Sequence, residues 1–244
     1  MVPVLETVSP LAVAAGGFPR RNGSPYLPGD SLRQAFLAAA LAYAIRRDEA
    51  FAAEMRRLVE HGFRGDVGGL AQQMEEALLR RQPELKTLRF ADVELAAVSS
   101  EVVVVYDTAN SEVAGSAEME VFGGEANLAT DLPPELETWL AAAARSHAES
   151  LATAEWEALR SGLPRSEAFY QKLKSRILKR EAWPLRVGHW TPDPQGSRLL
   201  ALARLENAVS ALKKRFGVTP LPRRILFSPS AGAGLGWLVL RREK

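Results

Sequence analysis

Short segments in which apolar and polar residues alternate occur at both ends and in the middle of the chain. Such alternation is typical of a strand that buries one face. The first segment, residues 2–15, stops at Gly16 and Gly17, where we expect a turn. Further strands are predicted over residues 88–95, 101–106, 116–122, 223–227 and 237–240.

Between these strands, apolar residues recur at helical spacing. They predict helices over residues 32–47, 50–60, 70–80, 135–159, 166–179 and 199–216. Several glycines separate the second of these helices from the third, which suggests a helical insertion. The order of the elements indicates an α+β fold whose sheet is assembled from both chain ends. We expect a single domain over residues 1–244, and the alternative is two halves, about 1–130 and 131–244.

The composition narrows the class of protein. The chain has 244 residues, of which 47% are apolar, enough for a substantial core. Because it has no cysteine, it has no thiol nucleophile or cysteine zinc site, and His61, His147 and His189 lack metal-ligand spacing. We therefore expect neither a metal nor a cofactor. No apolar run is long enough for a membrane span, and residues 1–10 lack a signal peptide's basic head, so we expect a cytoplasmic protein.

The net charge of +2 conceals an uneven distribution along the chain. Residues 172–244 hold 16 Lys and Arg against 4 Asp and Glu, a balance of +12, so the preceding residues carry 2 − 12 = −10. A polycationic segment of this kind favours a polyphosphate partner such as RNA. The alternative is a set of ordinary solvated helices.

Candidate RNA contacts lie on two predicted helices. The helix over 166–179 is amphipathic and presents basic side chains outward: Lys172, Lys174, Arg176, Lys179 and Arg180. The helix that follows Pro28 gathers unpaired amide groups at its start, an arrangement that attracts anions. Its candidate residues are Gly29, Ser31 and Arg33, although an ordinary helix cap explains the same pattern.

Two further segments could also contact RNA. The stretch around residues 185–192 combines Arg186, His189 and Trp190, which suits base stacking and phosphate pairing, although a structural turn remains the alternative. The loop after the strand over 223–227 could bring backbone amides close to phosphate, or its glycines could merely close a hairpin. Its candidate residues are Gly232, Gly234 and Gly236 with Arg223 and Arg224.

Residues suited to catalysis are few. Metal-independent RNA cleavage needs a general acid and base. His189 is the one histidine in basic surroundings, and Asp107 is a loop acid at the end of a predicted strand, where turn formation is the simpler role. We therefore expect no active site and keep both residues as weak candidates.

Four segments resemble the RAMP proteins of type III CRISPR systems. Residues 2–36 resemble the family's first strand and the Pro-Gly motif that begins its first helix, with departures at Asp30, Arg33 and Gln34. The ending "LFSPSAGAGLGWLVL" resembles the family's glycine-rich loop. The segments "PLRVGHW" and "SAEMEVFGGEANLATDL" resemble the fifth subunit of the type III-A Csm complex.

This resemblance implies a ferredoxin-like (RRM-like) RAMP fold with an antiparallel sheet and helical insertions. It also implies a non-catalytic subunit that binds guide RNA (crRNA), caps the effector near the 3′ part of the guide and contacts neighbouring RAMP subunits. Two alternatives remain open. One is a metal-independent endoribonuclease of the same superfamily, and the other is a protein scaffold whose basic third binds an acidic partner.

Overall fold

The computed structural model describes residues 3–13, 16–130, 132–177, 182–188, 196–205, 207–220 and 224–242. Its strands are β1 (Pro3–Thr7), β2 (Arg20–Arg21), β3 (Ser24–Leu27), β4 (Val93–Glu94), β5 (Ser99–Asp107), β6 (Glu112–Val121), β7 (Glu125–Asn127), β8 (Ala182–Arg186), β9 (Arg224–Ser228), β10 (Ala233–Gly234) and β11 (Trp237–Arg242). Its helices are α1 (Gly29–Arg47), α2 (Glu49–Arg57), η1 (Leu58–Gly62), α3 (Val67–Arg81), η2 (Pro83–Thr87), α4 (Pro134–Leu159), α5 (Ser166–Ile177), α6 (Gly196–Leu199), η3 (Leu200–Arg204) and α7 (Ala208–Phe216).

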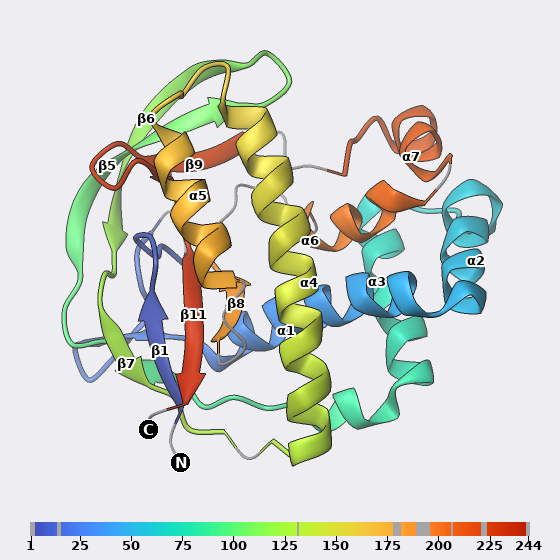
Figure 1. The fold of residues 1–244 in the computed structure, drawn as a ribbon, viewed down its shortest axis with the longest axis horizontal. Coiled ribbons are helices and arrows are strands. Elements are labelled where there is room, and N and C mark those ends of the chain that lie inside the picture. Colours follow the sequence, from blue (N-terminus) through green and yellow to red (C-terminus); the bar gives the residue numbers. More distant parts are fainter. Residues whose placement is uncertain are drawn as a thin grey trace.

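The first sheet joins the two ends of the chain, as predicted. Its strand order is β7-β1-β11-β8, and every neighbouring pair is antiparallel. Pro3 lies opposite Arg242 and Leu5 opposite Leu240, so both termini lie at one end of this sheet (Figure 1). Leu5, Leu240 and Leu238 belong to the main core cluster, whereas Glu6 and Arg241 occupy the other face.

The second sheet has the order β10-β9-β5-β6 and is also antiparallel. A short third sheet contains β2, β3 and β4. Each four-stranded sheet takes two strands from residues 1–130 and two from residues 131–244. Each sheet therefore contains strands from both sides of residue 130, so residues 1–130 and 131–244 do not form separate sheets.

The helices form two groups (Figure 1). α4 and α5 lie in front of the β8 and β11 region, and α1 passes behind α4, against which it packs. The predicted helical insertion is present as α2, η1 and α3, which extend away from the sheets, while α1 packs against α4 and β8. The expected α+β fold with antiparallel sheets and helical insertions is confirmed.

Three predictions of secondary structure were wrong. The helix expected over 199–216 is three short pieces, α6, η3 and α7, because Leu205 is extended and Asn207 has a left-handed backbone with φ of 64°. The strand expected over 88–95 is reduced to β4. No strand was predicted over residues 182–186, where β8 lies, and Pro184 is tolerated there because β8 is an edge strand.

None of the described helices is long and apolar enough to cross a membrane.

His147 is a buried histidine of α4, and burial lowers its pKa from 6.5 to about 4. The unfolded chain therefore binds a proton below about pH 6.5 that the folded chain accepts only near pH 4, so acid lowers the free energy of unfolding across that window. Through this residue, we expect the free energy of unfolding to fall by about 2 kcal/mol between about pH 7 and about pH 5. In the variant His147→Gln, the free energy of unfolding measured with urea should fall by about 2 kcal/mol less than in the wild type over the same pH range. Equal losses in the two proteins would contradict this origin of the pH dependence.

Candidate nucleic-acid interface

The predicted basic amphipathic helix is present as α5. Tyr170 and Leu173 are buried against α4 and the sheets, while Lys172 on the opposite side is exposed. Lys174 is partly buried, and its Nζ lies 5.3 Å from the centre of the Trp156 ring on α4. Lys172 and Lys174 are therefore the two cations of α5 that have no carboxylate partner among the described residues.

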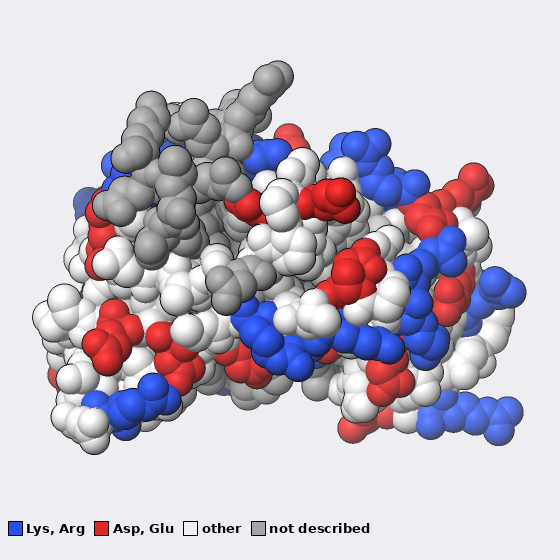
Figure 2. Space-filling model, turned by 90° about the horizontal axis from the view of Figure 1, so that it is seen from below, with Lys and Arg blue, Asp and Glu red and all other residues white. Residues whose placement is uncertain are grey.

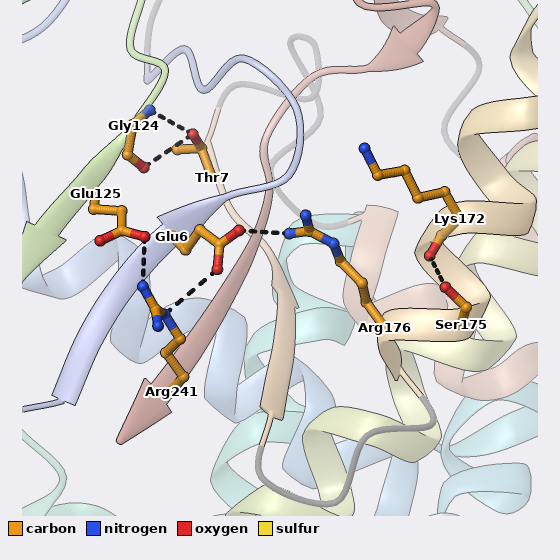
Figure 3. A network of polar contacts seen from close by, with 8 residues as sticks. All are labelled: Glu6, Thr7, Gly124, Glu125, Lys172, Ser175, Arg176 and Arg241. Atoms are coloured by element: carbon orange, nitrogen blue, oxygen red, sulfur yellow. Dashed lines mark hydrogen bonds and ion pairs between the residues drawn. The ribbon is translucent and has the colours of Figure 1, made fainter. Parts of the chain in front are cut away.

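Arg176, at the end of α5, is already paired with an acidic residue. Its Nη1 lies 2.6 Å from Glu6 Oε1 on β1, and Arg241 Nε lies 3.4 Å from the other oxygen of Glu6. Arg241 Nη2 also lies 2.5 Å from Glu125 on β7, so two guanidinium groups and two carboxylates alternate across the open face of the first sheet (Figure 3). The Arg176 side chain is 29% exposed, but Glu6 already neutralises its charge, so Arg176 attracts a phosphate less strongly than an unpaired cation does. Lys172 extends beside this network without a carboxylate contact (Figure 3).

Arg186 is not the surface cation that we expected. Its side chain is 2% exposed, and its Nε donates to Glu155 Oε1 at 3.0 Å. The prediction that Arg186 contacts RNA is therefore wrong for this structure, because a phosphate cannot reach a guanidinium that is enclosed between α4 and β8.

The carboxylate of Glu155 organises the surroundings of Arg186. Tyr170 Oη donates to Glu155 Oε2 at 2.9 Å, and Trp237 Nε1 donates to the same oxygen at 2.8 Å. Burial and the neighbouring carboxylate raise the pKa of Tyr170 well above 10, so its hydroxyl remains a donor. Because the four residues come from α4, α5, β8 and β11, this network fixes α5 on the sheet.

The start of α1 does not present free amides to an external anion. The amide of Gly29 donates to Asp92 Oδ1 at 3.0 Å, and the amide of Ser31 donates to the carbonyl of Pro28 at 2.9 Å. A Cβ at position 29 would lie 2.0 Å from the carbonyl oxygen of Phe90. This position therefore requires glycine for packing, and the protein's own Asp92 caps the helix. Arg33 is mostly buried, with its Nη1 4.0 Å from Asp30.

The glycine loop between β9 and β11 also serves packing. Gly236 has φ of +84°, its amide donates to the carbonyl of Pro10 at 2.7 Å, and a Cβ there would lie 2.0 Å from the carbonyl of Val187. Gly234 is buried beside Tyr170, whose hydroxyl would lie 2.9 Å from an added Cβ. The expectation that both glycines approach phosphate is wrong, since neither is accessible. Gly232 is partly exposed at the tip of the loop.

Asp107 has the role of a turn former. Its Oδ1 accepts from the amides of Ala109 at 2.8 Å and Asn110 at 3.3 Å, and the residue is 5% exposed. Arg224 lies opposite it on β9 and is exposed. Over the part of the chain that the structure describes, no group of three His, Cys, Asp or Glu residues could hold a metal ion. The predicted contacts Lys179, Arg180, His189, Trp190 and Arg223 lie outside the described residues.

The uneven charge of the sequence is partly resolved within the molecule. Basic residues of the C-terminal third pair with acidic residues from earlier in the chain, as Arg176 does with Glu6 and as Arg198 does with Glu75 at 2.6 Å. On the visible part of the face in Figure 2, basic and acidic side chains are accordingly interspersed. In the sequence, the negative balance of residues 1–171 is what could have indicated this pairing with the basic residues of 172–244.

Replacing Arg186 by an apolar residue tests the network around Glu155. Arg186→Met leaves a buried carboxylate without its cation, which we expect to lower the free energy of unfolding by about 3–5 kcal/mol. The double variant Arg186→Met/Glu155→Gln keeps an acceptor for Tyr170 and Trp237 but removes the charge, so it should be more stable than Arg186→Met. Urea unfolding measures both. A loss below about 1 kcal/mol for Arg186→Met, within the range of surface ion pairs, would contradict this interpretation.

Comparisons with known proteins identify the fold. No protein-family model matches the sequence. An uncharacterized protein of Aquifex aeolicus (strain VF5) is 25% identical over 239 residues, which are 96% of this chain and 97% of that protein. A chain in the cryo-EM structure of a Csm–crRNA–target RNA ternary complex of a type III-A CRISPR-Cas system matches with a TM-score of 0.61 and 17% identity, covering 92% of this chain and 74% of that one. The crystal structure of T. onnurineus Csm5 matches with a TM-score of 0.57 and 18% identity, covering 91% and 73%. The fold expected from the sequence resemblance is therefore confirmed, and it is shared with these Csm structures.

Proposed function

We propose that this protein is a non-catalytic, crRNA-binding subunit of a type III CRISPR effector complex, most similar to Csm5 of type III-A systems. The observation that carries the proposal is the agreement of the fold with T. onnurineus Csm5 over 91% of the chain. In this proposal the protein caps the complex near the 3′ part of the guide RNA. It contacts neighbouring RAMP subunits there and works in the cytoplasm.

The cations of α5 support the RNA-binding part of the proposal. Lys172 is exposed, Lys174 packs over the Trp156 ring on another side of the same helix, and neither has a carboxylate partner among the described residues. Side chains of this kind bind the phosphate backbone without reading sequence. A capping subunit that must hold guides with different spacers needs contacts of this type.

The surroundings of Asp107 support the non-catalytic part. Its Oδ1 accepts hydrogen bonds from two amides of its own turn, which is the behaviour of a turn residue. The endoribonuclease alternative keeps His189 and Asp107 as its candidate residues. It predicts that RNA is cut in EDTA, and that His189→Ala or Asp107→Ala abolishes the cutting.

RNA binding by the purified chain tests the proposal. We expect a ~40-nucleotide single-stranded RNA to bind in a filter assay, with affinity that falls steeply between about 50 mM and about 200 mM salt, because bound phosphates release counterions. A gel of the bound RNA, after incubation in EDTA, should show intact molecules. Cut RNA would favour the endoribonuclease. Absence of binding at low salt would contradict RNA recognition and favour the protein scaffold.

A charge reversal on α5 tests where the RNA lies. Lys172→Glu should weaken binding and reduce the slope of log Kd against log salt by roughly 0.7–1, the change expected for one lost phosphate contact. Lys86→Glu on η2 is the matched control, since Lys86 is also exposed and the charge change is equal. If the two variants bind RNA equally well, α5 is not the contact surface.

A further inference from the structure

A second group of cations lies at the helical end of the molecule, away from α5. Three belong to the segment 56–66, which runs from the end of α2 through η1, and three belong to the last turn of α7. None of the six lies within ion-pair distance of a carboxylate among the described residues, in contrast to Arg176 and Arg241. We call this group the lobe surface, and it consists of Arg56, Arg57, Arg64, Lys213, Lys214 and Arg215.

The fold itself brings these two segments together. The guanidinium of Arg215 donates to the carbonyls of Val59 and Phe63, which belong to η1 and the residue that follows it. The rings of Phe63 and Phe216 lie 6.4 Å apart and pack the same junction. Since carbonyls are neutral acceptors, these bonds orient Arg215 without cancelling its charge. The contacts thus place Lys213 and Lys214 beside the basic residues of the other segment.

On the two described segments the cations outnumber the carboxylates. These segments contain Glu60 and Asp66 against six cations, a local balance of +4, and Glu54 of α2 and Glu76 of α3 line the pocket beside Arg57. Asp66 accepts from the amide of Gly69 at 2.8 Å, which caps α3, and Glu60 lies 3.9 Å from the imidazole of His61. Arg56 Nε is buried without a hydrogen-bond acceptor among the described residues.

The chemistry of the surface indicates the kind of partner. A membrane-binding helix or a protein interface combines cations with exposed apolar side chains. On the two described segments the only large apolar residue that is exposed is Val209, at 38%. The phosphate backbone of a nucleic acid, by contrast, is bound by cations and hydrogen-bond donors and needs no exposed apolar side chains.

We infer that the lobe surface binds the phosphate backbone of RNA as a second contact site, separate from α5. This inference rests on the proposed function, because it takes RNA as the partner. In Figure 1, α7 lies on the far side of α4 from α5, so the two sites would engage different stretches of one RNA. Among the described residues, the lobe surface has six cations without a carboxylate partner and α5 has two, Lys172 and Lys174. We therefore expect the lobe surface to make the larger contribution to the salt dependence.

Charge reversals at exposed lysines of α7 test the inference. Lys213→Glu and Lys214→Glu are compared with the control Lys86→Glu in the same filter assay with single-stranded RNA, over the same salt series. Each should weaken binding several-fold and reduce the slope of log Kd against log salt by roughly 0.7–1, while the control stays at the wild-type value. Thermal melting checks that each variant is folded, and Lys213→Gln/Lys214→Gln replaces the reversals if these disturb the end of α7.

The outcomes separate the inference from the proposed function. If the lobe variants bind like Lys86→Glu while Lys172→Glu loses affinity, the lobe surface is not an RNA site and the proposed function stands. If the wild-type chain binds no RNA at low salt, the proposed function fails, and the inference fails with it. Weaker binding and a lower salt slope in both lobe variants support the second contact site.

Discussion

The buried carboxylate of Glu155 is the interaction on which the arrangement of the sheets and helices depends. It accepts hydrogen bonds from Arg186, Tyr170 and Trp237, and each donor comes from a different element. A buried charge is tolerated only when its partners are complete, so the elements that supply them must occupy fixed positions. In this way Glu155 connects α4, α5 and β8 with β11, whose Trp237 lies 82 residues from it along the chain.

Charge pairing between distant parts of the chain also determines the charge of the surface. Across the first sheet, acidic residues of the N-terminal part neutralise basic residues of the C-terminal third, as Glu6 does for Arg176 and Glu125 does for Arg241. The surplus of positive charge in the C-terminal third therefore does not form one continuous basic face. Among the described residues, the cations that have no carboxylate partner include those of α5 and of the lobe surface. The distribution of unpaired cations, and not the total charge, indicates where a polyanion can bind.

The parts of the fold that local sequence determines could be predicted. α1 and α4 have long apolar repeats and proline at their starts, and β5 and β11 have β-branched or apolar runs, so their bounds agree with prediction to within a few residues. β1 ends at Thr7, well before the predicted end at residue 15. β8 was missed because it contains Pro184 and Arg186, which disfavour a strand unless it lies at an edge and the cation is paired. The break before α7 depends on the left-handed backbone of Asn207, which its sequence alone does not require.

The candidate site was less predictable than the fold, for a physical reason. Whether an arginine is a surface contact depends on which carboxylate reaches it, and Glu155 lies 31 residues from Arg186 while Glu6 lies 170 residues from Arg176. The glycines raised the same difficulty. Positions 29 and 236 need glycine because a Cβ would clash with the carbonyls of Phe90 and Val187, which belong to distant segments. Residue type indicates which side chains could bind a phosphate, but only the tertiary structure shows which of them are exposed and not already paired within the protein.

The most direct test of the central claim is to isolate the tagged protein from its own host and sequence the RNA that accompanies it. An RNA-binding subunit of a type III effector should carry crRNAs, with spacer sequences joined to a common repeat-derived end, together with other Csm subunits. Recovery of the protein without RNA, or with RNA that lacks such repeats, would contradict the claim.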